Sequence, residues 1–244
     1  MFATHALAGK RQVVVYILLL WASLLPVVLA GAYVFTPYLS NRVGDWKSLA
    51  LVPVHAFWLW GLWTLSALLV SRAAWGLARR AHPPREGVFP RDRNDPDYRA
   101  WTWRATCKKL GFWAAHVFPL PWLEYFAYRW FGGRGKGGGA FYDCTVDPEF
   151  LDLGEDARLG VGCIVTPSMV MGDKLVIAKI RVGARSVIGA RARLAPGTVV
   201  GDDVVLSALS VTEIGQHLES GYMYAGVPAQ KFRKNELVVD GHSP

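Results

Sequence analysis

The stretch "VGARSVIGARARLAPGTVVGDDVVLSALSV", residues 182–211, repeats one pattern every six residues. An aliphatic residue occurs at each repeat: Val182, Ile188, Leu194, Val200 and Leu206. Four positions later comes a small or short side chain: Ser186, Ala192, Thr198, Val204 and Ser210. A helix buries a residue every three to four positions and a half-buried strand every two. Neither structure explains a period of six.

A short fixed period is typical of stacked repeat architectures, and six is the period of hexapeptide β-helices. Short strands form the faces of a three-sided prism, and one coil takes about eighteen residues. We expect the aliphatic residues to point inward and the small residues to fit the crowded corners, with coils about 4.8 Å apart. Gly183, Gly189 and Gly201 follow aliphatic residues, and we expect them at turns because glycine adopts dihedrals that other residues avoid.

The same rule holds earlier in the chain and then fails. Leu153 leads to Ala157, and Leu159 leads to Cys163. Between 165 and 181 large side chains fall at positions where the pattern needs small ones. The sequence therefore predicts that this segment either distorts a coil or leaves the prism as a loop.

Two long uncharged runs lie near the N-terminus, at residues 12–41 and 48–71. Each exceeds the roughly 20 residues that cross about 30 Å of hydrocarbon, so we predict a two-span transmembrane hairpin over residues 1–71. A cleaved signal peptide is the alternative for the first run, because Lys10 and Arg11 precede it. That run is longer than the apolar core of a signal peptide, about 7–15 residues, which favours an anchor.

The formal charge of +8 is concentrated beside these runs. Residues 72–136 carry 13 basic and five acidic side chains, net +8, whereas residues 137–244 carry ten and 13, net −3. By the positive-inside rule both termini face the cytoplasm, which predicts a multi-pass protein of the cytoplasmic (inner) membrane. Basic residues beside a span favour membrane lipids as partners and disfavour nucleic acid. The three cysteines are expected to be free thiols, and no Cys/His cluster suggests a metal.

Residues 72–139 are predicted to be a basic linker with interfacial aromatic helices. The polar, proline-rich segment 79–98 is the linker. In residues 98–131 tryptophan, phenylalanine and tyrosine alternate with arginine and lysine, and two prolines divide the segment. We expect two helices lying in the membrane interface, with a third span as the alternative. "GGRGKGGG" (132–139) lacks the ending of a phosphate-binding loop, and is read as a hinge or an irregular first coil. The prism is predicted at 140–234, and a C-terminal tail at 235–244.

Residues 150–233 resemble the left-handed β-helix, hexapeptide-repeat acyltransferase superfamily, and "YAGVPAQKFRK" (224–234) is similar to the segment that closes many of its prisms. The layout is similar to a membrane module of polylysine-synthetase-like nonribosomal peptide synthetases. The resemblance implies a homotrimer with acyl-CoA, expected to be acetyl-CoA, between neighbouring prisms. It also implies the cofactor contacts: Gly226, Val227 and Pro228 at the pantetheine arm, and Lys231 and Arg233 at the phosphates. The alternative is that Pro228 merely ends the last coil and both basic residues are solvated.

Acyl transfer to a hydroxyl or amine needs a general base, usually histidine. The resemblance implies a Thr-His pair on a loop, yet the corresponding place here reads Thr166-Pro167-Ser168. His217 in "TEIGQHLESG" is the remaining candidate for the catalytic base, with Glu213 and Glu219 to orient it; a solvated histidine is the alternative. The three zinc-binding histidines of gamma-class carbonic anhydrases are missing, so no metal is expected.

Together these observations predict a membrane-anchored β protein: two transmembrane helices, interfacial helices and a short left-handed parallel β-helix. The first functional hypothesis is an acyltransferase that moves an acyl group from acyl-CoA to a hydroxyl or amine of a membrane-associated glycan, lipid or peptide. The second, motivated by the missing loop histidine, is a non-catalytic trimerising or docking module of a membrane synthetase or transporter. A synthetase or a glycan-assembly protein is the partner class that either hypothesis implies.

Overall fold

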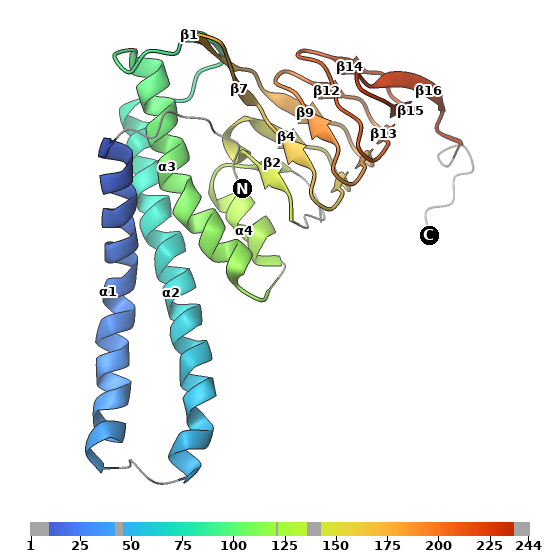
Figure 1. Cartoon of the computed structure of the whole chain (residues 1–244). Coiled ribbons are helices and arrows are strands. Elements are labelled where there is room, and N and C mark those ends of the chain that lie inside the picture. Colours follow the sequence, from blue (N-terminus) through green and yellow to red (C-terminus); the bar gives the residue numbers. More distant parts are fainter. Residues whose placement is uncertain (1–9, 42–45, 121, 136–142, 237–244) are drawn as a thin grey trace. The chain divides into compact units, whose positions relative to one another are not determined.

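The computed structural model describes residues 10–41, 46–120, 122–135 and 143–236, and the chain divides into two compact units (Figure 1). One unit holds the N-terminal helices to Ala81 together with residues 103–119. The other holds residues 82–102 and the chain from 120 onward. We call them the helical unit and the prism unit.

The helical unit is built on α1 (Lys10–Asn41) and α2 (Trp46–Ala81). They are long and apolar enough to cross a membrane over Lys10–Val34 and Ala50–Ala81, by length and composition. Large apolar side chains are exposed along both. The second half of α3 (Pro96–Val117) packs against them through a small apolar cluster. The cluster consists of Ala67, Leu110 and Ala114, with Tyr16, Leu19, Leu20 and Trp63 against them.

The prism unit stacks short parallel strands into three faces. Face 1 consists of β2 (Arg134–Gly135), β4 (Leu151–Leu153), β9 (Ile180–Val182), β12 (Val199–Val200) and β14 (His217–Leu218). Face 2 consists of β5 (Arg158–Leu159), β10 (Val187–Ile188), β13 (Val205–Leu206), β15 (Tyr222–Ala225) and the antiparallel β16 (Gln230–Lys234). Face 3 consists of β3 (Thr145–Val146), β6 (Ile164–Val165) and β11 (Arg193–Leu194). A short 3₁₀ helix, η1 (Pro148–Phe150), precedes β4.

The predicted period of six is confirmed by this architecture. Val187 pairs with Val205, and Val199 pairs with His217, so successive coils are 18 residues apart. The five aliphatic residues of the repeat are at most 3% exposed, and the five small residues after them at most 1%. Both sets line the interior of the prism, as the pattern predicted. The left-handed sense of the coils stays a prediction.

The interruption predicted at residues 165–181 contains a β-hairpin, residues 168–177, that leaves the prism. Arg158 pairs with Val187 across 29 residues instead of 18. Within the insertion β7 (Ser168–Met171) pairs antiparallel with β8 (Lys174–Ile177). Of the two readings left open, the segment therefore leaves the prism, and it does so as an ordered hairpin.

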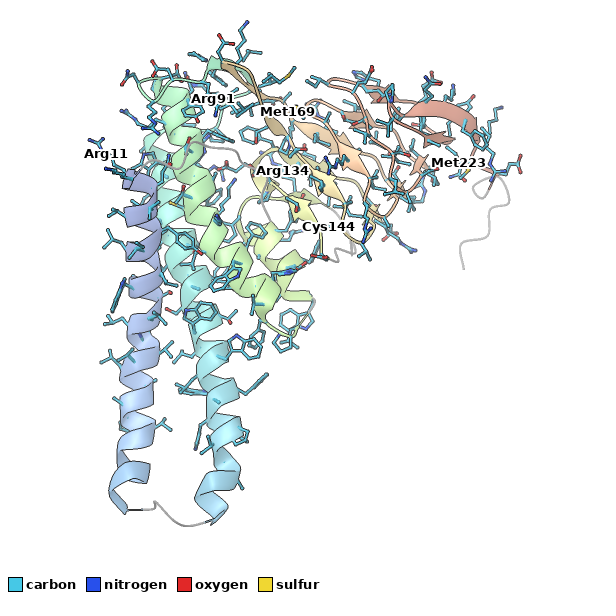
Figure 2. The ribbon with its side chains drawn as sticks, in the orientation of Figure 1. Arg11, Arg91, Arg134, Cys144, Met169 and Met223 are labelled. Atoms are coloured by element: carbon cyan, nitrogen blue, oxygen red, sulfur yellow. The ribbon has the colours of Figure 1, made fainter. Side chains whose placement is uncertain are left out.

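The linker predicted at 79–98 was wrong in part, because it contains a strand. β1 (Gly87–Pro90) pairs antiparallel with β8 and completes a three-stranded sheet. Arg91 is bonded to the turn of the hairpin, because its backbone N–H donates to the carbonyl of Asp173 (2.6 Å) (Figure 2). An apolar cluster beneath the sheet orders the segment: Tyr98, Trp101, Phe150, Leu175 and Ile177, with Phe89 and Val170 packed against them.

The glycines that follow aliphatic residues serve close packing, which corrects our expectation that they form the turns. A Cβ on Gly183 would lie 2.4 Å from the backbone of Gly201, and a Cβ on Gly189 2.4 Å from the nitrogen of Ala208. The left-handed backbone conformations fall two positions later. They recur every six residues at Arg185, Arg191, Gly197, Asp203, Leu209, Gly215 and Gly221.

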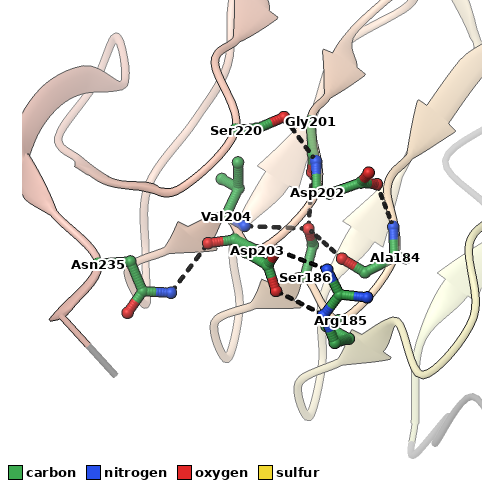
Figure 3. Close-up of polar contacts among 9 residues, drawn as sticks. All are labelled: Ala184, Arg185, Ser186, Gly201, Asp202, Asp203, Val204, Ser220 and Asn235. Carbon is green, nitrogen blue, oxygen red and sulfur yellow. Dashed lines mark hydrogen bonds and ion pairs between the residues drawn. The ribbon is translucent and has the colours of Figure 1, made fainter. Parts of the chain in front are cut away.

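Polar side chains tie successive coils together at the corner between faces 1 and 2 (Figure 3). Arg185 donates two hydrogen bonds to the carboxylate of Asp203, at 2.7 and 2.6 Å. The backbone N–H of Ala184 donates to Asp202 (2.7 Å), whose own N–H donates to Ser220 (3.0 Å). Each contact joins residues about one coil apart, so this corner is fixed by side chains as well as by strand pairing.

Both ends of the prism are covered. α4 (Trp122–Trp130) packs on the first coil, where buried Tyr128 donates through its hydroxyl to the carbonyls of Arg134 (2.9 Å) and Leu151 (3.0 Å). At the other end β16 pairs with β15, and the amide of Asn235 donates to the carbonyl of Asp203 (2.9 Å). β2 begins at Arg134, so the first coil starts before residue 140; residues 136–142 of the glycine-rich boundary lie outside the described residues.

Candidate functional site

A groove of about 340 Å³ runs along face 3, where the hairpin leaves the prism. Its wall is formed by residues from α3, from the β6–β7 connection, from the hairpin and from β11. They are Trp101, Ile164, Thr166, Ser168, Met169, Val170, Arg193, Leu194, Ala195, Val211 and Thr212. Met169 lies on the hairpin strand β7 (Figure 2).

The β6–β7 connection is held firmly in place. The N–H and the hydroxyl of Thr166 both donate to the carbonyl of Leu194, at 3.1 and 3.2 Å. The carbonyl of Pro167 accepts from Ala178 (2.9 Å). Thr166 and Ser168 line the groove and flank Pro167, which occupies the position of the histidine in the implied Thr-His pair.

Trp101 contributes a buried donor. Its side chain is 2% exposed and lines the groove, and its indole N–H has no hydrogen-bond partner among the described residues. A buried donor without a partner costs about 1–3 kcal/mol. The groove wall therefore contains a buried polar atom whose hydrogen bond is not made among the described residues.

Two threonines stabilise the coil beneath the groove. Thr212 occupies an interior position where the repeat predicts an aliphatic residue, and it is 3% exposed. Its hydroxyl oxygen accepts from the N–H of Ala195 (2.9 Å) and lies 2.8 Å from the hydroxyl of Thr198. The polar interior therefore fixes the backbone of Ala195, which forms part of the groove wall.

Positive charge accumulates on face 3. Arg193 projects outward from β11 and lines both the groove and a second hollow of about 370 Å³. The second hollow also contains Arg191, Gly162 and Leu209. The residues that line the two hollows include two arginines and no carboxylate, which suits an anionic ligand such as a phosphate.

The segment Gly226–Pro228 extends the same face. The N–H of Val211 donates to the carbonyl of Gly226 (3.0 Å), and the N–H of Ala229 donates to the carbonyl of Val211 (2.8 Å). Val211 itself bridges to Arg193 and lines the groove. Three of the predicted cofactor residues, Gly226, Val227 and Pro228, thus lie one layer beyond the groove, and Val227 is 71% exposed.

The other two predicted cofactor residues lie elsewhere. Lys231 and Arg233 belong to β16 on face 2. The ammonium of Lys231 pairs with Glu219 and lies 3.5 Å from the ring centre of Tyr222; the hydrogen bond to that carboxylate, opposed only in part by desolvation, raises the pKa of Lys231. Both groups are near the surface and available to solvent.

His217 projects from β14 on face 1 and is exposed. Of its two predicted orienting carboxylates, Glu219 pairs with Lys231, and Glu213 is bound through its backbone N–H to Gln216 (2.9 Å). The structure therefore places His217 and the groove on different faces of one chain. The residues that line the groove include no histidine, cysteine, aspartate or glutamate.

A thiol nucleophile is also absent from the groove wall. Cys144 and Cys163 occupy neighbouring coils with their sulfur atoms 3.2 Å apart and are not bridged. The hydrogen bond to Cys144, together with burial, raises the pKa of Cys163. A neutral buried thiol is a poor nucleophile, so this pair has a structural role.

The groove contains residues that the repeat did not single out. The outward direction of Arg193 could be predicted from the inward Leu194 beside it, because inward and outward residues alternate along a strand. Trp101 lies in a helix far from the repeat, and no periodicity relates it to face 3. Met169 and Val170 could be placed only once the hairpin was known.

Comparison with protein families identifies the repeat. Residues 179–211 match the family described as "Hexapeptide repeat of succinyl-transferase", so this segment is a hexapeptide repeat. Over 84 residues the chain is 30% identical to a Delta-poly-L-ornithine synthetase of Acinetobacter baumannii (strain AB307-0294), in line with the expected likeness to polylysine-synthetase-like proteins. That match covers 34% of this chain and 6% of the length of the relative.

Solved structures with a similar shape include two acyltransferases. A maltose O-acetyltransferase from Clostridium difficile 630 is 18% identical, with a TM-score of 0.40 over 46% of this chain and 74% of that one. AntD, an N-acyltransferase from Bacillus cereus in complex with dTDP and 3-hydroxybutyryl-CoA, is 22% identical, with a TM-score of 0.35 over 43% of this chain and 68% of that one.

Proposed function

We propose that the chain is a membrane-anchored acyltransferase of the hexapeptide-repeat type, which moves an acyl group from acyl-CoA to a hydroxyl or amine of a membrane-associated glycan, lipid or peptide. The observation that carries the proposal is the composition of face 3. The groove and the hollow beside it bring together two arginines, hydroxyl groups and the neighbouring Gly226–Pro228 segment.

These groups match the parts of an acyl-CoA by their chemistry. Arg191 and Arg193 suit its phosphates, because guanidinium groups bind phosphate oxygens in pairs. The Gly226–Pro228 segment offers backbone groups and little side-chain bulk for the pantetheine arm. Acetyl is the acyl group we propose.

A homotrimer is part of the same proposal. Acyl transfer needs a base to take the proton from the acceptor, and the groove of a single chain has none. An assembly that sets face 1 of one copy against face 3 of the next would bring the exposed His217 to the groove. The base would then take the acceptor proton while the hydroxyl or amine attacks the thioester carbonyl and CoA leaves as its thiol.

Membrane anchoring is the third part of the proposal. Two apolar helices, α1 and α2, support it, and the Lys/Arg distribution supports a topology with both termini in the cytoplasm. This arrangement holds the prism beside lipid-linked acceptors.

Calorimetry on detergent-purified protein tests cofactor binding. We expect acetyl-CoA to bind the wild-type protein and to bind Arg193→Ala at least about tenfold more weakly, because a charge-assisted hydrogen bond contributes about 1.5–3 kcal/mol. Arg158→Ala is the matched control, since Arg158 projects from the same kind of strand on face 2. No binding by the wild-type protein at millimolar acetyl-CoA would remove the proposal.

The alternative is a non-catalytic trimerising or docking module, and the groove without a base favours it. Release of CoA thiol in the presence of membrane extract separates the two functions. The enzyme predicts turnover that His217→Ala reduces at unchanged acetyl-CoA affinity. The docking module predicts no turnover above background for either protein.

A further inference from the structure

The second half of α3 runs along α2 from its basic end toward its middle. Leu110 and Ala114 pack with Ala67 of α2. Further along α3's direction, the ring of Phe118 lies 5.3 Å from the ring of Trp60 and 5.7 Å from that of Phe57, centre to centre. The contacts therefore shift toward the N-terminal half of α2 as the chain leaves α3.

The depth of Phe118 follows from helix geometry. The Phe118 ring is 3.7 Å from the Cβ position of Gly61. Gly61 is 11 residues from Arg72, the first charged residue after the apolar run of α2. At about 1.5 Å per residue that is roughly 16 Å, which is half of the roughly 30 Å hydrocarbon core.

Residues 110–120, the end of α3 and the turn after it, are called the tip here, and their sequence suits that depth. Residues 110–123 contain no Lys, Arg, Asp or Glu. Trp113 is 47% exposed and Val117 43% exposed, and such apolar side chains suit contact with lipid. The charged residues stop at Lys109, whose ammonium lies 5.9 Å from the ring centre of Tyr16 near the start of α1. Lys109 thus marks the same end of the helical unit as the arginines that end α2.

Both ends of the tip return to one compartment. Residues 82–102 before it and the chain from 120 after it belong to one compact unit. A segment that enters the bilayer between two parts of one folded unit must leave on the side where it entered.

We propose that residues 110–120 form a re-entrant element, which inserts into the hydrocarbon of an anionic phospholipid bilayer to about its midplane and leaves on the cytoplasmic side. The proposal rests on the membrane anchoring proposed above and replaces the interfacial helix expected there. Lys109 and Arg72 lie near the phosphate level, where basic side chains attract anionic headgroups.

Spin labels in vesicles of phosphatidylethanolamine and phosphatidylglycerol test the proposal. Single cysteines replace Val117, Lys109, Leu65 and Leu209 in a background with Cys107→Ala, Cys144→Ala and Cys163→Ala. Collision rates with oxygen, which concentrates in hydrocarbon, and with a water-soluble nickel chelate report the surroundings of each label. Leu65 is 51% exposed on α2 and is the hydrocarbon standard; Leu209 is 66% exposed on the prism and is the water standard.

We expect the label at Val117 to report high oxygen and low nickel collision, at a depth equal to or greater than that at Leu65. The label at Lys109 should show more nickel collision than that at Val117. High nickel collision at Val117, or low collision with both reagents as in a protein contact, would overturn the re-entrant element while the Leu65 standard keeps the anchor intact. A water-like signal at Leu65 would overturn the anchor, and the re-entrant element with it.

Discussion

Gly189→Ala tests the stacking of the coils directly. A Cβ at this position would lie 2.4 Å from the nitrogen of Ala208, whereas ordinary contacts begin near 3.4 Å. The next coil must therefore move by about 1 Å, the difference of these distances. Such a shift stretches the Gly189 N–H to Leu206 carbonyl hydrogen bond from 2.7 Å to beyond bonding range.

The cost has two parts. Overpacking in a close-packed interior costs about 1–3 kcal/mol, and one or two lost inter-coil hydrogen bonds add about 1 kcal/mol each. We therefore expect Gly189→Ala to destabilise the prism by about 2–5 kcal/mol. Gly215→Ala is the matched control, because a Cβ there meets nothing within 4 Å and only its φ of +70° opposes alanine. Its expected cost is about 1 kcal/mol, the lower end of the range for a strained backbone position.

Thermal unfolding followed by circular dichroism measures the difference on the full chain in detergent. A difference of about 1–4 kcal/mol predicts that Gly189→Ala melts at least roughly 4 °C below Gly215→Ala. Equal melting temperatures for the two variants would refute the close stacking of coils at Gly189.

Three further substitutions report on the prism. Tyr128→Phe should destabilise it by about 1–2 kcal/mol, because two buried carbonyls lose their donor. Burial raises the pKa of Tyr128 above its usual value. The contribution of Tyr128 to the stability of the prism is therefore complete below about pH 10 and is lost as pH rises through the folded-state pKa. Denaturant titrations at alkaline pH should show a steeper loss of stability for the wild-type protein than for Tyr128→Phe. Thr212→Val should cost about 1–3 kcal/mol, since the N–H of Ala195 loses its acceptor; an unchanged denaturation midpoint would show that this bond is dispensable. Leu194→Ala should destabilise the prism by about 2–5 kcal/mol, because it leaves a cavity in the core. A loss of stability smaller than that of Thr212→Val would contradict an inward Leu194.

The period of six predicted the interior of the prism because each repeat restates one physical demand. Every coil needs an aliphatic side chain inside and a small one near the corner, so both positions were readable before any contact was known. The glycines were misjudged for a related reason. Gly183 and Gly201 are 18 residues apart and occupy the same position in successive coils. That spacing predicts a close approach between coils, whereas the residues next to each glycine in the chain predict only a turn.

The hairpin could not be predicted from the repeat. Val170 and Val176 keep the spacing of six by coincidence, while β8 alternates inward and outward residues with a period of two. What orders the hairpin is a cluster with Phe89, Tyr98 and Trp101, far away in sequence. The groove depends on that hairpin, so it could not be predicted either, and the cofactor role of the Gly226–Pro228 segment beside it stays a prediction from the family resemblance.

A cryo-EM structure of the full chain in lipid nanodiscs with a non-hydrolysable acetyl-CoA analogue tests the central claim most directly. The account predicts density for the analogue along face 3, with its phosphates at Arg191 and Arg193 and its thioester end in the groove beside Trp101. An empty groove at saturating analogue, or analogue bound only on face 1 or face 2, would contradict it.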